Sequence, residues 1–122
     1  MPNPFVHIEL TTQDLAKAKK FYSALFDWQL TDMPMGEGKS YTMINVGDGT
    51  GGGMMSAPDP GIPPHWLPYV AVDDLAASTA KAKSLGATMI MENIPVQDYG
   101  RFTIFKDPTG ALIAMWQNER KM

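Results

Sequence analysis

The spacing of hydrophobic and polar positions changes its period near the start of the chain. Apolar residues alternate with polar ones from 6 to 10, the pattern of a strand that buries one face. From 15 to 25 the apolar residues recur at helical spacing, which predicts a helix. Either Thr11 or Thr12 is expected to cap this helix, with Asp14 in its first turn.

Three short strands follow the predicted helix, and the whole order then recurs. In the first half these strands are expected at 28–31, 41–46 and 52–56. The second half predicts a strand at 66–72, a helix at 75–85 and strands at 88–92, 102–105 and 112–116. The sequence therefore predicts the order βαβββ twice.

An internal repeat supports this duplication. Asp14 and Leu15 recur sixty residues later as Asp74 and Leu75, each pair at the start of a predicted helix. A repeated unit that cannot bury its apolar face alone is expected to share a core with its copy. Such a duplication implies a pseudo-symmetric body with a cleft between its halves.

A proline-rich segment separates the two copies. Residues 57–64 contain four prolines, which favours a stiff extended connector. A chain of 122 residues is long enough for one core and too short for two independent ones. We predict a single α+β domain over 1–122, made of two βαβββ modules at about 1–56 and 65–118.

Composition narrows the classes of function. Thirteen acidic and ten basic residues give a net charge of −3, without the basic stripe that nucleic acid or an anionic membrane requires. Cysteine is absent, so disulfides, thiol nucleophiles and thiolate metal sites are excluded. The start of the chain lacks a basic leader, and no segment approaches the roughly 20 apolar residues that span a bilayer. We expect a cytoplasmic protein.

Three segments resemble a known superfamily. They read TTQDLAKAKKFYSALFDW in the first module, VDDLAASTAKAKSLGA at its counterpart, and DPTGALIAMWQ near the end. With the paired βαβββ order, they resemble the vicinal oxygen chelate superfamily, which includes glyoxalase I, the bleomycin resistance proteins and extradiol dioxygenases. The resemblance covers nearly the whole chain. It implies that each module curls into a half-barrel and that paired modules enclose a cleft.

The resemblance also implies where a divalent metal would bind. Metal-dependent members carry ligands on the first and last strands of each module, and these positions match His7, Met54, Leu67 and Ala114 here. Only His7 offers a suitable donor, because a thioether is a weak ligand for such ions and leucine and alanine offer none. We therefore favour no cofactor, with a divalent metal as the alternative.

A displaced metal site is that alternative. His7, Glu9 and His65 share strand parity and would form a set of two histidines and one carboxylate. His7 and Glu9 are also the candidates for catalysis, since imidazole titrates near neutral pH. If the two side chains meet, the Glu9 carboxylate is expected to raise the pKa of His7 and to orient its ring.

Strand parity predicts which side chains line the cleft. Val6, Ile8, Ile44, Val46, Val70, Val72, Ile113 and Met115 are expected to face the helices. The opposite face then carries His7, Tyr41, Met43, Asn45, Met54, Leu67, Tyr69, Phe105, Ala114 and Trp116 as candidate ligand-binding residues, together with Thr103 and Leu112. The alternative is that these aromatic and methionine side chains simply fill the barrel.

These observations favour a glyoxalase- or bleomycin-resistance-like protein that binds a small apolar or aromatic molecule without the usual metal. One alternative is a metal-dependent, glyoxalase-like lyase or a dioxygenase that uses the displaced site. Another is a non-catalytic structural or partner-binding module. The connector and the resemblance further predict a two-fold homodimer, with first and second modules meeting across the interface.

Overall fold

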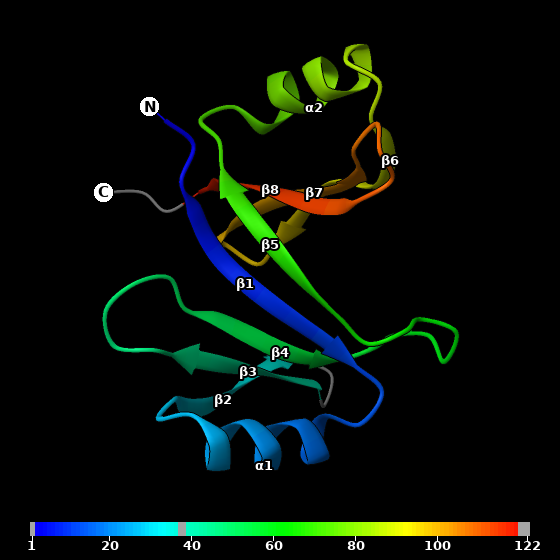
Figure 1. Cartoon of the computed structure of the whole chain (residues 1–122). Helices are drawn as coiled ribbons and strands as arrows, with labels where there is room; N and C mark the ends of the chain where they lie inside the picture. Colours follow the sequence, from blue (N-terminus) through cyan, green and yellow to red (C-terminus); the bar gives the residue numbers. More distant parts are fainter. Residues whose placement is uncertain (1, 37–38, 120–122) are drawn as a thin grey trace. The chain divides into compact units, whose positions relative to one another are not determined.

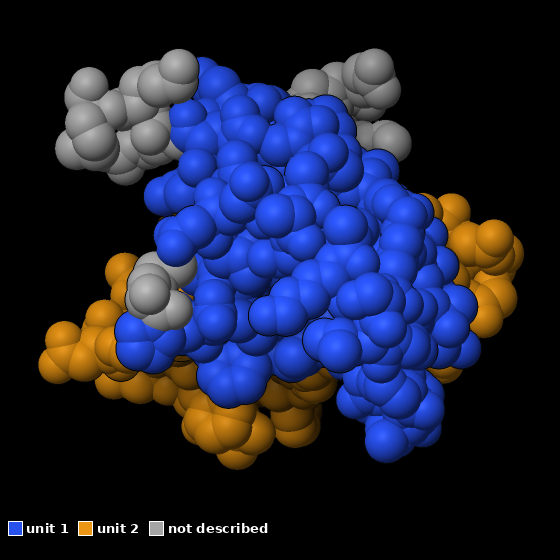
Figure 2. Space-filling view, turned by 90° about the horizontal axis from the view of Figure 1, so that it is seen from above, with its two compact units in different colours: residues 1–5, 68–122 blue, residues 6–67 orange. Residues whose placement is uncertain are grey.

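A computed structural model describes residues 2–36 and 39–119. The chain divides into two compact units, which Figure 2 colours separately. The N-terminal unit contains residues 6–67, and the C-terminal unit contains residues 1–5 with 68–122. The proline-rich segment 57–64 lies in the N-terminal unit, where the Gln13 side-chain amide donates hydrogen bonds to two carbonyls of its turn.

The N-terminal unit contains one helix and a four-stranded sheet (Figure 1). Its elements are β1 (Phe5–Thr12), α1 (Leu15–Leu25), β2 (Gln29–Gly36), β3 (Lys39–Asn45) and β4 (Gly52–Ser56). The strand order is β2-β3-β4-β1, with β1 parallel to β4 and the other neighbours antiparallel. In Figure 1, α1 lies along one face of this sheet.

The C-terminal unit repeats this topology. Its elements are β5 (His65–Ala71), whose first three residues belong to the N-terminal unit, α2 (Leu75–Ser84), β6 (Thr88–Val96), β7 (Gly100–Lys106) and β8 (Leu112–Asn118). The order is β5-β8-β7-β6, and again the first strand is parallel to the last. The predicted α+β fold of two βαβββ modules is therefore confirmed. Among the described residues, neither helix is long and apolar enough to cross a membrane.

The first helix starts later than predicted. Asp14, and neither threonine, is its N-cap, and its carboxylate accepts a hydrogen bond from the Lys17 amide. Asp74 caps α2 in the same way through the Ala77 amide. Thr11 and Thr12 instead belong to β1, which continues to the end of its pairing with β4.

The core of the N-terminal unit lies between the sheet and α1. Leu10, Ile44 and Met54 are buried there, and side chains of the helix pack against them. Burial of these apolar surfaces against the helix supplies the main stabilisation of the unit. We call this side of the sheet the helix face and the other side the opposite face.

The C-terminal unit buries a polar contact under its helix. The hydroxyls of Thr79 on α2 and Thr103 on β7 lie 3.0 Å apart, and the Thr103 hydroxyl also accepts a hydrogen bond from the Asn93 amide. Thr103 is thus on the helix face of this unit. Its pairing partner on β8 is Met115, which shares that face and is also buried.

The pairing registers show that the internal repeat has two offsets. Leu10 pairs with Met54, and the equivalent pair in the second module is Val70 with Met115. Equivalent residues of the two modules are therefore sixty residues apart in the first strands and sixty-one apart in the last strands. Thr42 and Thr103 follow the larger offset, because they pair with Met54 and Met115 respectively.

This one-residue difference corrects three predicted positions. Met54 lies in the core on the helix face, and Thr103 and Phe105 lie on the helix face of the second module. All three were expected on the opposite face. Because strand side chains alternate, an error of one residue moves each of them to the other side of the sheet. Ile44 and Met115 do face the helices, as predicted.

We predict that Met54→Ala lowers the free energy of unfolding by about 2–5 kcal/mol, because it leaves a cavity in the core. Urea unfolding followed by circular dichroism measures this change. Met43→Ala is the matched control, since Met43 on the neighbouring strand is 39% exposed whereas Met54 is 0% exposed. Equal losses in the two variants would contradict the assignment of Met54 to the core.

Candidate functional site

Three polar side chains meet on the opposite face of the N-terminal unit. His7 and Glu9 project from β1, because both have the parity opposite to that of buried Leu10. Tyr41 projects from β3 to the same side, because its parity is opposite to that of buried Ile44. The structure therefore brings together the two predicted catalytic candidates and one predicted ligand-binding residue.

The three side chains form a directed hydrogen-bond chain. The Tyr41 hydroxyl donates to Oε2 of Glu9 at 2.7 Å. Nε2 of His7 lies 2.7 Å from the same hydroxyl oxygen. A phenol has one proton, and it is directed at the carboxylate, so Nε2 of His7 must carry the proton of the second hydrogen bond. We refer to these residues as the His7–Tyr41–Glu9 chain.

Burial determines the protonation of His7. Loss of water around the imidazole lowers its pKa below the ordinary value of 6.5, and the negative charge of Glu9 raises it by a smaller amount. The expected raising effect of Glu9 on the His7 pKa is confirmed, and desolvation is the larger contribution, so the net pKa is lowered. His7 is therefore neutral at pH 7 and acts as an Nε2–H donor.

A glycine makes room for this arrangement. A side-chain carbon added at Gly53 on β4 would collide with the ring and hydroxyl of Tyr41. The Tyr41 side chain therefore lies across the backbone of β4, which separates β3 from β1 in the sheet. Without a side chain at this position, the Tyr41 hydroxyl reaches the two polar groups of β1.

A hollow opens where β2 and β3 meet the loop before β4, and side chains of the opposite face form part of its lining. It has a volume of about 350 Å³, and Met43, Asn45, Gln29 and Thr31 are among the residues that line it. Pairing aligns Thr31 with Met43, Met43 with Gly53, and Gly53 with Glu9 in one row across the four strands. Two predicted ligand-binding residues thus line the hollow. Met43 lies in the same row as Glu9, and Asn45 lies in the next row on that face.

The other candidates lie as follows. Leu67 is buried, and it lies in the first part of β5, which belongs to the N-terminal unit. In the C-terminal unit, Tyr69, Ala114 and Trp116 share the face away from α2, since Tyr69 pairs with Ala114 and Thr103 faces the helix. Their role in ligand binding stays a prediction.

Phe102, which the sequence reasoning missed, belongs to the same face. Its ring meets that of Tyr69 edge-on, with centroids 6.1 Å apart. The alternation within β7 was the available signal, but the assumed offset of sixty gave it the wrong phase. With the observed offsets, His7, Glu9 and Tyr41 correspond to Leu67, Tyr69 and Phe102. At these positions the second module therefore has no imidazole or carboxylate, although Tyr69 keeps a phenol.

The residues present do not fit the metal site that the fold family implies. With Met54 in the core, the position on β4 that corresponds to Ala114 is Gly53, which has no donor. His7 again remains the one ligand among the four positions. The displaced alternative fails as well, because His7, Glu9 and His65 form no metal-holding group among the described residues. Nδ1 of His65 instead lies 2.9 Å from the Pro63 carbonyl oxygen.

We predict that protonation of His7 destabilises the fold. Its pKa is lower in the folded than in the unfolded chain, so the unfolded state takes up this proton first as the pH falls. The contribution of His7 to the free energy of unfolding is complete above pH 6.5 and is lost as the pH decreases toward the folded-state pKa. His7→Leu, which copies Leu67 of the second module, should remove this part of the pH dependence.

Urea unfolding of both proteins between pH 5 and 8 measures the difference. Identical slopes for wild type and variant would contradict the burial of a neutral imidazole. Glu9→Gln tests the second contribution, because loss of the negative charge should lower the His7 pKa further in an NMR titration.

Comparison with known proteins identifies relatives over most of the chain. The family model for the Glyoxalase/Bleomycin resistance protein/Dioxygenase superfamily matches residues 5–115. A protein of Mycobacterium tuberculosis named "Putative glyoxylase CFP32" is 37% identical over 107 residues, which are 88% of this chain and 41% of the relative. The anthracycline biosynthesis protein DnrV of Streptomyces peucetius is 29% identical. The alignment covers 89% of this chain and 45% of the relative. The chain thus spans less than half the length of these relatives.

Solved structures share the fold at lower identity. A hypothetical protein from Bacillus halodurans aligns over 100% of this chain and 99% of its own, with a TM-score of 0.74 and 14% identity. Methylmalonyl-CoA epimerase from Mycobacterium tuberculosis aligns over 95% of this chain and 88% of its own, with a TM-score of 0.70 and 18% identity. The family expected from the sequence is therefore confirmed, and the chain belongs to the Glyoxalase/Bleomycin resistance protein/Dioxygenase superfamily.

Proposed function

We propose that this protein binds a small apolar or aromatic molecule on the opposite face of the N-terminal unit. The ligand lies in the hollow lined by Met43 and Asn45, and a polar group at its edge reaches the His7–Tyr41–Glu9 chain. The observation that carries the proposal is this hydrogen-bonded chain, present on the same sheet face as the hollow.

The second module shows that the scaffold does not require the polar chain. At the equivalent positions it has Leu67, Tyr69 and Phe102, of which the last two meet through their rings. Placing an imidazole, a phenol and a carboxylate on a sheet face costs desolvation that apolar side chains avoid. Retaining them at one module alone is consistent with recognition of a ligand there.

The chemistry of the chain defines the polar part of the ligand. Neutral His7 donates to Tyr41, and Tyr41 donates to a carboxylate, so Glu9 concentrates negative charge at the end of the chain. A ligand hydroxyl is a suitable partner, because it can donate a hydrogen bond to the Glu9 carboxylate. Met43 supplies an adaptable apolar surface for the body of the ligand.

The names of the relatives support a planar ligand. Two Streptomyces relatives are named anthracycline biosynthesis proteins, and anthracyclines contain a planar fused-ring core that carries hydroxyl groups. The hollow of about 350 Å³ is at the lower end of the volume range of small-molecule sites, which suits a compact aromatic molecule. A dihydroxyanthraquinone is a suitable probe because it combines flat rings with adjacent hydroxyls.

We predict saturable binding of a dihydroxyanthraquinone and weaker binding of unsubstituted anthraquinone, measured by absorbance titration. Tyr41→Phe should reduce the affinity for the hydroxylated probe by about fivefold to tenfold, because one hydrogen bond is lost. The same substitution should leave the affinity for unsubstituted anthraquinone nearly unchanged.

Gly53→Ala serves as a second variant, because the added methyl group displaces the Tyr41 ring without removing its hydroxyl. It should reduce binding of the hydroxylated probe as Tyr41→Phe does. Met33→Ala on β2 is the control for an exposed apolar side chain, since Met33 is 38% exposed and does not line the hollow. Absence of binding, or equal losses in the control and Tyr41→Phe, would refute the proposal.

A further inference from the structure

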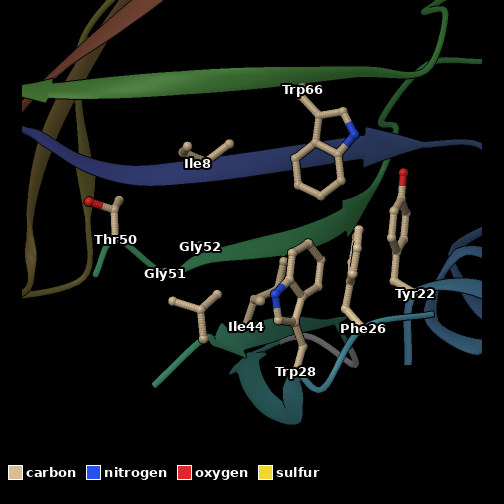
Figure 3. A pocket seen from close by; sticks show the side chains of 10 residues that line it. Ile8, Tyr22, Phe26, Trp28, Ile44, Thr50, Gly51, Gly52 and Trp66 are labelled. Atoms are coloured by element: carbon tan, nitrogen blue, oxygen red, sulfur yellow. The ribbon is translucent and has the colours of Figure 1, made fainter. Parts of the chain in front are cut away.

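A second cavity lies on the helix face of the N-terminal unit, and it shares Ile44, Val46 and Gly51 with the lining of the first hollow. Its volume is about 300 Å³. Ile8, Ile44 and the backbone of Gly51 and Gly52 form part of its wall, as Figure 3 shows. Ile44 belongs to the core beneath α1, which assigns the cavity to the helix face.

Four aromatic side chains form the other walls. Tyr22 and Phe26 come from the C-terminal end of α1 and the residue after it, Trp28 precedes β2, and Trp66 lies on β5. Figure 3 shows the rings of Trp28 and Trp66 directed toward one another from opposite sides. Their centroids are 6.3 Å apart at an interplanar angle of 74°, and Tyr22 contacts both.

These rings are more exposed than core packing requires. Phe26 is 44% exposed and Trp66 is 37% exposed, although both line the cavity. An aromatic side chain that only fills a core is normally covered on both sides, because its large apolar area is the source of its stabilisation. The aromatic walls therefore leave apolar ring surface available inside an open cavity.

The second module builds the same fold without this cluster. At the offset of sixty residues that aligns the two helix caps, Tyr22, Phe26 and Trp28 correspond to Ala82, Gly86 and Thr88. A βαβββ module thus folds with small residues at the end of its helix. The rings supplied by α1 and the segment before β2 are therefore a property of the first module and not a requirement of the scaffold.

The walls also restrict the charge of an occupant. The lining residues of this cavity, all of them within the described part of the chain, carry no ionisable group except the Tyr22 phenol. A carboxylate or ammonium group inside would lose its hydration without gaining an ion pair. A neutral, flat molecule instead gains ring contacts with the aromatic walls and loses little hydration.

We infer that this cavity is a second binding site, for a neutral planar aromatic molecule of one or two rings such as an indole. The site differs from the proposed ligand site in its aromatic side chains, none of which lines the first hollow, although the two adjoin at Ile44, Val46 and Gly51. Indole enters the cavity and packs against the exposed ring surface of Phe26 and Trp66, while Trp28 and Trp66 keep their edge-to-face contact. The Gly51–Gly52 backbone, which has no side chains, forms a flat part of the wall.

The three tryptophans of the chain allow a site-specific test. Each gives one indole N–H signal in an NMR spectrum of isotope-labelled protein. Titration with unlabelled indole should shift the signals of Trp28 and Trp66 in a saturable manner and leave that of Trp116, in the other unit, unchanged. An indole carboxylate should bind at least about tenfold more weakly because of its charge.

Two variants and a control test the walls. Trp66→Ala removes one ring, and Ile8→Phe fills the cavity from the sheet without touching the lining of the first hollow; each should weaken indole binding by at least about tenfold in calorimetry. Phe21→Ala is the matched control, because Phe21 is an exposed aromatic residue on α1 that does not line the cavity. It should retain the wild-type affinity within about twofold.

Three outcomes would overturn the inference. The first is the absence of saturable binding by indole, and the second is an equal shift of all three tryptophan signals. The third is a dimer, detected by light scattering, that dissociates in Trp66→Ala while indole fails to bind the wild type. That result would assign the aromatic walls to an interface between copies of the chain. None of these outcomes bears on the hydroxylated probe of the opposite face, so the two proposals fail separately.

Discussion

The pairing register of β1 with β4 is the constraint on which the rest of the N-terminal unit depends. It sets Leu10 beside Met54 and Glu9 beside Gly53. The first pair builds the core under α1, and the second leaves space on the opposite face for the ring of Tyr41. A shift of one residue would bury Gly53 against the helix and direct Met54 into the space that Tyr41 occupies, so core and site are determined by the same register.

The same register explains the electrostatics of the site. His7 and Glu9 are two residues apart on one strand, so their side chains lie on the same face. The Tyr41 hydroxyl, on another strand, links them through two hydrogen bonds. The phenol of Tyr41 gives the carboxylate a hydrogen bond and keeps a proton on Nε2 of His7. Burial then lowers the pKa of the imidazole despite the neighbouring charge. Two neutral donors, His7 and Tyr41, thus lead to the negatively charged Glu9 carboxylate.

The sequence was sufficient for the order of elements and the family, because amphipathic periods and the duplicated motifs persist along the whole chain. It was insufficient for the phase of single strands. The repeat offset changes from sixty to sixty-one residues between the helix and the last strands, and this change reversed the expected faces of Met54, Thr103 and Phe105. Tyr41 was expected on the correct face, but its position between His7 and Glu9 depends on Gly53, whose backbone it crosses. The aromatic cavity combines residues from α1, β5 and the segment before β2, a combination that no local pattern indicates.

The second module separates what the fold needs from what it does not. Both modules bury a threonine and a methionine on paired strands under the helix, Thr42 with Met54 and Thr103 with Met115. Both also cap the helix with an aspartate. They differ where the first module has its polar chain and its aromatic cluster. Because the two copies fold with the same topology, these differences are not explained by the stability of the module. The first module therefore carries a polar feature on one face of its sheet and aromatic rings on the other, and we propose that both serve the recognition of small molecules.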